Sequence, residues 1–144
     1  MPRLELWMTV FAGVAGGLAG VLWSGLVTAV WLPRDGAAPQ GAQQDTAAQI
    51  VLASALRAAA GAVLGFVFWL SWGLIALVGL PWYAVGLIYG GLCWLALVVP
   101  ALATLALRWP GPGARRVVTA HAVEWLLTCL SIGLLCALAW HRYA

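Results

Sequence analysis

The sequence predicts an all-α protein, a four-transmembrane-helix bundle with short connections. Of its 144 residues, 65% are hydrophobic and only 8% are charged, whereas a soluble domain of this size carries about 25% charged residues. Four apolar segments are each long enough to cross roughly 30 Å of hydrocarbon at about 1.5 Å per residue. Tryptophans lie near the ends of these segments, as in the interfacial belts of membrane proteins.

The predicted spans are apolar runs separated by polar or proline-containing breaks. After the polar loop 33–45, we expect a helix that starts at the membrane interface over residues 46–57, with Asp45 as its N-cap. Pro81 turns the second span into the third, and Pro100 is expected to kink the third. We expect one membrane domain, 1–144, with spans 6–32, 58–79, 82–107 and 117–140.

All seven basic residues are arginines, and their distribution predicts the orientation. Five lie in the connections 33–57 and 108–116, which share one side of the membrane, whereas Arg3 and Arg142 lie near the termini on the other. Because basic loops stay in the cytoplasm, we expect the two connections to be cytoplasmic and both termini periplasmic. The lysine-free, alanine- and glycine-rich composition indicates a GC-rich bacterial genome, and therefore a bacterial inner membrane.

Small residues recur at four-residue spacing on three of the predicted spans. This spacing lets helix backbones approach closely, which is how helices associate where no hydrophobic effect drives them together. The alternative is a water-lined or substrate-lined pathway between the helices. We favour packing, and expect the following positions at helix crossings: Gly16, Gly20, Ser24, Gly61, Gly65, Gly86 and Gly90.

The last span carries a polar face with an ionisable residue at membrane depth. Its members are spaced three or four residues apart, so they line one side of the helix: His121, Glu124, Thr128 and Ser131. Glu124 follows Arg116 by eight residues, roughly 12 Å along a helix. An intramembrane carboxylate normally faces the protein interior and pairs there. Among the arginines from the same membrane side, Arg57 is the partner that we propose, with His121 alongside.

Several functions could follow from such a cluster. The first interpretation is an ion pair that fixes helix packing, or a headgroup contact. The others are proton or ion handling, and contact with a ligand, pigment or lipid. His121 is a weak candidate for binding a cofactor such as a pigment. It lies twenty residues from His141 on one helix, roughly 30 Å, so the two cannot both ligate one haem. We predict no metal site and no cofactor.

Catalytic signatures are missing from the sequence. It has no paired intramembrane aspartates, no glycine-rich phosphate loop and no serine or cysteine with a recognisable base. We therefore predict that the chain is not an enzyme and has no catalytic residues. A formal charge of +3 is too small to indicate a nucleic-acid partner.

The first hundred residues resemble those of small four-helix bacterial inner-membrane proteins, including the YagU-like group. The resemblance rests on FAGVAGGLAGVLWSGLV in the first span, GAVLGFVFWL in the second and GLIYGGLCWLALVVP in the third. It implies an inner-membrane protein of unassigned activity, and it assigns no functional residue.

These observations favour a non-catalytic structural or accessory subunit that packs in the lipid bilayer against itself or against other subunits of a larger membrane complex. The spans carry more regularly spaced small residues than the packing of one four-helix bundle should need. The alternative, from another class, is a small transporter or proton-coupled channel organised around Glu124 and His121. A less favoured hypothesis is a pigment- or quinone-binding subunit.

Overall fold

Over the residues that the structure describes, the chain forms four long helical segments and is all-α, as predicted. A computed structural model describes residues 2–31, 47–75, 79–108 and 111–143. Within these residues, each segment is long and apolar enough to cross a membrane; the shortest apolar stretch, Ile50–Ser71, has 22 residues, about 33 Å of helix. The chain therefore has the architecture of a multi-pass membrane protein. Its elements are α1 (Pro2–Trp31), α2 (Ala47–Ile75), α3 (Trp82–Cys93), the π-helical turn η2 (Trp94–Val98), α4 (Val99–Arg108) and α5 (Pro112–Tyr143).

The helix bounds differ from the predicted spans chiefly in the second segment. A continuous α2 begins at Ala47, so it includes the residues 46–57 at which we expected the helix to start, apart from residue 46, which lies outside the described residues. It ends at Ile75, and Gly79 has a φ of 65°, a left-handed conformation in which a helix does not continue. The predicted loop 33–45 and the N-cap Asp45 lie outside the described residues.

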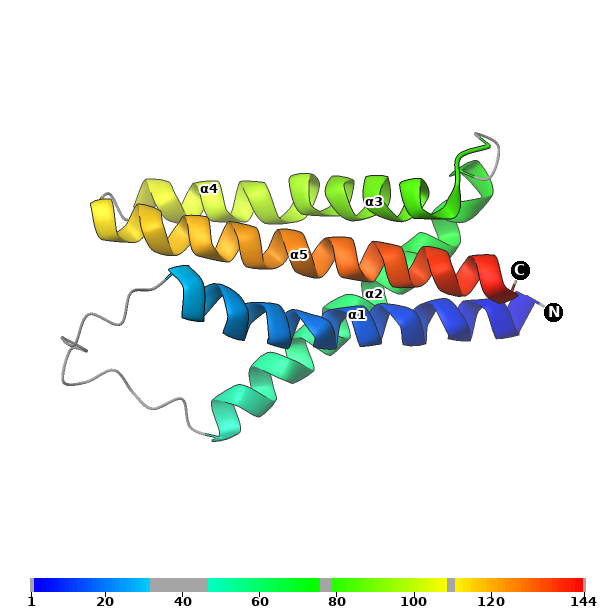
Figure 1. Ribbon diagram of the computed structural model, residues 1–144, viewed down its shortest axis with the longest axis horizontal. Coiled ribbons are helices and arrows are strands. Elements are labelled where there is room, and N and C mark those ends of the chain that lie inside the picture. Colours follow the sequence, from blue (N-terminus) through cyan, green and yellow to red (C-terminus); the bar gives the residue numbers. More distant parts are fainter. Residues whose placement is uncertain (1, 32–46, 76–78, 109–110, 144) are drawn as a thin grey trace.

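A π-helical turn just before Pro100 stands in place of the predicted kink. Proline has no N–H to donate, and its ring crowds the carbonyl four residues earlier. The chain accommodates this with η2, where the N–H of Val99 bonds to the carbonyl of Trp94, five residues back. Beyond this turn α4 continues along the line of α3 (Figure 1).

Helix α5 is the centre of the arrangement. It packs along α1 on one side and along α3 on the other, while α2 packs mainly on α1 and crosses it obliquely (Figure 1). The two ends of the molecule differ as a result. Towards the chain termini the four segments converge, and towards the α4–α5 connection α2 diverges from its neighbours.

We call the end that contains the termini the packed half. Its core joins α2, α3 and α5, and the residues that form it are Phe68, Val85, Tyr89, Ile132, Cys136 and Ala137. The open half consists of residues 21–31 of α1, 47–56 of α2, all of α4 and 112–123 of α5. Among the open-half residues whose burial is described, Val27 is the one that is buried.

Close helix crossings in the packed half depend on glycine. A Cβ added at Gly90 would lie 2.6 Å from the carbonyl oxygen of Cys129, and one at Gly65 would lie 2.6 Å from that of Thr9. Backbones can approach this closely only where no side chain intervenes. All six glycines singled out from the sequence lie at such crossings. Ser24 is half-buried.

Candidate functional site

The centre of the candidate site is an ion pair between α2 and α5. The guanidinium of Arg57 contacts Oε1 of Glu124 through Nη2, and its Nη1 donates a hydrogen bond to the carbonyl oxygen of Gly20 on α1. Glu124 is only 4% exposed. These are the two residues that the sequence analysis paired, and through Gly20 the guanidinium also engages α1, so one side chain joins three helices.

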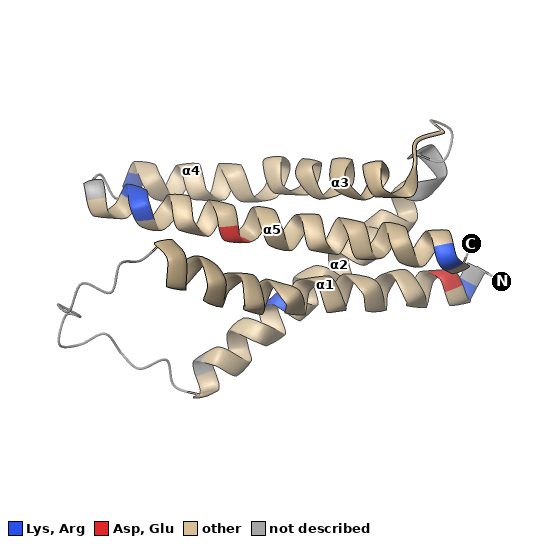
Figure 2. Cartoon of the chain, viewed as in Figure 1, with Lys and Arg blue, Asp and Glu red and all other residues tan. Residues whose placement is uncertain are grey.

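Both charges lie well inside the membrane-spanning stretches. Arg57 follows the start of its apolar stretch, Ile50, by seven residues, and Glu124 follows Gly113 by eleven. At about 1.5 Å per residue these separations are roughly 10 and 16 Å. Charged groups at this depth are costly unless they are paired. Figure 2 shows an acidic position partway along α5, the helix whose sequence contains Glu124.

Two ring systems complete the surroundings of the pair. Nδ1 of His121 lies 3.4 Å from Oε2 of Glu124. The guanidinium carbon of Arg57 lies 5.4 Å from the centre of the Trp125 ring, which is within the range of a cation–π contact. The side chain of His121 is 52% exposed, so the cluster reaches the surface of α5 on this one side.

The two hydroxyl residues of the predicted polar face do not contact the carboxylate. Oγ1 of Thr128 donates to the carbonyl oxygen of Glu124 at 2.9 Å and packs against Gly20. Oγ of Ser131 donates to the carbonyl oxygen of Leu127 at 2.8 Å and accepts the indole N–H of Trp23 at 3.0 Å. The structure therefore gathers three of the five predicted cluster residues around the charge and uses the other two to join α5 to α1.

Sequence reasoning missed three members of this site. Trp125 follows Glu124 directly, and a neighbouring tryptophan is a signal that could have been used. Trp23 was noticeable as an indole deep in the first span, where its N–H needs a partner. The carbonyl of Gly20 could not have been found, because every helical residue presents the same group.

The polar groups of this site are well satisfied. Within the described residues, no buried side-chain nitrogen or oxygen lacks a hydrogen-bond partner. The carboxylate of Glu124 has a partner on each oxygen, and Arg57 has a carboxylate, a carbonyl and an indole around it. A buried ion pair is stable only when its geometry is complete in this way. The arrangement therefore joins α1, α2 and α5 through buried polar groups.

Fold and site together define a multi-pass membrane protein whose interior holds one three-helix ion-pair cluster. No protein-family model matches the chain, and neither a curated protein nor a solved structure matches it. The resemblance to the YagU-like group stays a prediction. Inferences about function therefore rest on the chain's own residues.

Proposed function

We propose that the chain is a non-catalytic structural or accessory subunit of the bacterial inner membrane, which packs against itself or against a larger membrane complex. The observation that carries the proposal is the set of small residues left uncovered in the open half and directly beside it on α2. Among the described residues, no atom of a neighbouring helix lies within 4 Å of where a Cβ of Gly25 would be. Ala29, four residues further on, is exposed, as are Ala55 and Ala59 on α2.

These positions matter because the glycines singled out from the sequence are already used within the chain. The glycines singled out from the sequence contact neighbouring helices within the chain. Gly25 with Ala29, and Ala55 with Ala59, repeat the same four-residue spacing without such a neighbour. Small residues at this spacing are enriched where membrane helices meet. The open half therefore has the composition of a helix interface on faces that its own helices leave free.

The ion pair supports the non-catalytic part of the proposal. Arg57 and Glu124 neutralise each other and hold α1, α2 and α5 together at the border of the two halves. A carboxylate engaged on both oxygens fixes the angle at which α2 leaves the bundle, and so presents the open half to a partner. Its role here is to position helices.

Purification in a mild detergent tests this proposal. We expect the parent protein to leave the membrane in a stoichiometric complex, with a second copy or with other subunits. Gly25→Leu and Ala59→Leu should release it as a folded monomer. The matched control is Ala15→Leu, an exposed alanine on the packed half, which should stay in the complex. A parent protein that is purely monomeric and without partners would overturn the proposal.

The proposed orientation places the α1–α2 and α4–α5 connections in the cytoplasm and both termini in the periplasm. Arg57 no longer counts as a connection residue, because it is paired inside α2. The two connections therefore hold four arginines and the terminal regions hold two, so the excess of arginines stays on the predicted cytoplasmic side. A reporter active only in the periplasm should work after Ala144 and fail near Gly41. The reverse pattern would show that the first span sets the orientation.

The second candidate function is a proton-coupled transporter or channel organised around Glu124 and His121. It is favoured by the half-exposed imidazole of His121, which connects the helix surface to the second oxygen of Glu124. Glu124→Gln would then keep a folded protein and abolish proton flux into liposomes, because the amide cannot titrate. The structural proposal expects no such flux from the parent protein.

A further inference from the structure

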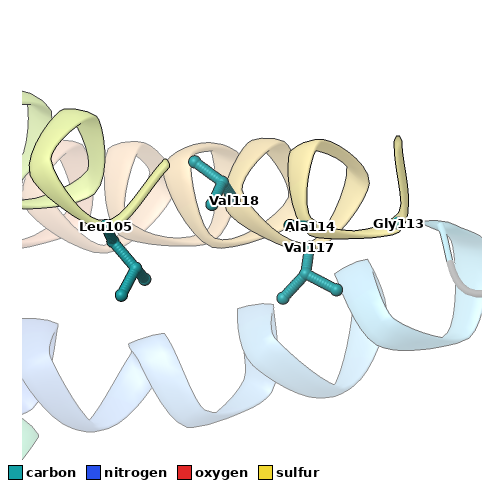
Figure 3. Close-up of a pocket in the computed structure, with 5 residues that line it drawn as sticks. All are labelled: Leu105, Gly113, Ala114, Val117 and Val118. Atoms are coloured by element: carbon teal, nitrogen blue, oxygen red, sulfur yellow. The ribbon is translucent and has the colours of Figure 1, made fainter. Parts of the chain in front are cut away.

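A second feature lies at the far end of the open half, away from the ion pair. An apolar hollow of about 200 Å³ is present between α4 and the first turns of α5 (Figure 3). The side chains of Leu105 and Val117 point to the same side of it. Its lining residues are Leu105, Gly113, Ala114, Val117 and Val118. A hollow with such walls, at the surface of a membrane helix pair, is suited to hydrocarbon.

Three arginines lie close in sequence to the residues that line this hollow. Arg108 lies one turn beyond Leu105 on α4, and Arg115 and Arg116 come between Ala114 and Val117 on α5. All three are exposed, and Figure 2 shows basic positions gathered at this end of α4 and α5. They lie at the ends of the two helices, which is the level of lipid headgroups.

No carboxylate in the described ranges neutralises these arginines. The nearest acid along α5, Glu124, is eight residues beyond Arg116 and is occupied by Arg57. Within the described residues these guanidinium groups have no carboxylate partner, and the three arginines lie one to three positions along the chain from residues that line the apolar hollow. Guanidinium groups bind phosphate oxygens through two parallel hydrogen bonds, which an ammonium cannot do as well.

We propose that this end of α4 and α5 is a binding site for one anionic phospholipid. The phosphate lies among Arg108, Arg115 and Arg116, and one acyl chain occupies the hollow below it. Basic pockets between membrane helices are known to select such headgroups. A zwitterionic lipid brings its own cation close to the three arginines, so its binding free energy is less favourable. A free phosphate gains nothing from the apolar walls.

The opposite end of the molecule provides an internal comparison. There a second hollow, lined mainly by Leu135, Leu138 and Ala139, has the single cation Arg142 in its wall. One arginine beside an apolar hollow gives a weaker attraction for an anionic headgroup than three. The proposal therefore predicts a preference for anionic lipid at one end of the molecule.

The test uses the full chain, purified in an uncharged detergent and stripped of lipid. Phosphatidylglycerol, phosphatidylcholine and inorganic phosphate are titrated separately, and bound lipid is counted by native mass spectrometry alongside thermal unfolding. We expect one phosphatidylglycerol to bind saturably and to raise the unfolding temperature. Phosphatidylcholine should bind at least tenfold more weakly, and phosphate should not stabilise the protein.

Paired variants separate charge from shape. Arg115→Gln with Arg116→Gln should weaken phosphatidylglycerol binding about 30-fold, at roughly fivefold for each arginine near the headgroup. The same substitutions at Arg3 and Arg142 remove equal charge from the other end and should leave the affinity unchanged. Ala114→Leu fills the hollow with every arginine in place and should also weaken binding.

Several results would overturn the proposal. These are equal affinity for the two lipids, equal stabilisation by phosphate alone, or an equal loss in the variant of Arg3 and Arg142. If the glutamine pair does not fold, Arg115→Lys with Arg116→Lys keeps the charge and should retain most of the preference for phosphatidylglycerol. Loss of that preference in a folded lysine pair would contradict an electrostatic site.

Discussion

The packed and open halves are built from the same apolar helices and differ in what lies against them. Phe68 is completely buried, whereas Leu107 is 83% exposed, although both belong to strongly apolar segments. In a bilayer, lipid covers an apolar side chain as well as protein does, so hydrophobicity alone does not bring helices together. The difference lies in backbone contact: glycines close the crossings of the packed half, and beyond the pair of Arg57 and Glu124 α2 diverges from its neighbours.

The ion pair at the border should give the largest effect of any single substitution. Glu124→Gln leaves the guanidinium of Arg57 buried without its counter-charge, which typically costs about 3–5 kcal/mol. The double variant Arg57→Gln with Glu124→Gln removes both charges and should recover much of the loss. The measurement is the free energy of unfolding in detergent for the parent, the single variant and the double variant. If Glu124→Gln is as stable as the parent, the pair does not hold the helices.

The second-largest effect should be the difference in stability between a glycine substitution in the packed half and one in the open half. Gly90→Leu places a side chain against the carbonyl of Cys129, where a Cβ alone would lie at 2.6 Å. Such overpacking costs typically 1–3 kcal/mol. Gly25→Leu meets nothing within 4 Å and should not lower the stability of the isolated monomer. Thermal unfolding of both variants measures the contrast, and equal losses would mean that the open half is closed in solution.

The hydrogen bond between α2 and α3 should give a smaller effect. The hydroxyl of Tyr89 donates to the carbonyl oxygen of Leu64 at 2.6 Å, and Tyr89→Phe should cost about 1 kcal/mol. The exposed Tyr83 on the same helix provides the control, since Tyr83→Phe removes a hydroxyl from the surface. The free energies of unfolding of the two variants should differ by about that amount. Equal values would indicate that this bond does not join the helices.

The sequence was sufficient for the fold class because lipid requires each span to satisfy its own backbone. Long apolar runs therefore mark helices without knowledge of their neighbours. The oblique crossing of α2 was not predictable, because it depends on which helix each glycine faces. Gly16 and Gly20 contact α5, whereas Gly13 and Gly17, which the analysis did not single out, contact α2. A second pair at four-residue spacing, three positions earlier in the same span, was the available signal.

The candidate site was predictable to a similar depth. A carboxylate at membrane depth requires a counter-charge, and this argument led to Arg57 and Glu124. It could not show that Arg57 would also engage a backbone carbonyl of α1, or that Ser131 would receive the indole of Trp23. Backbone partners carry no residue-specific signal, and such cross-helix contacts depend on the packing angles.

The separation of Arg57 and Glu124 along the chain has a consequence for biosynthesis. The two residues are 67 positions apart, so at 5–20 residues per second the ribosome needs about 3–13 seconds to deliver the acid after the base. During that interval α2 enters the bilayer with an unneutralised guanidinium, a burden of about 2.5–3.5 kcal/mol at mid-membrane depth. The valines, leucines and phenylalanines around Arg57 offset this burden at insertion. When α5 enters the bilayer, Glu124 neutralises Arg57 and removes that cost. The stable insertion of α2 therefore depends on the last helix.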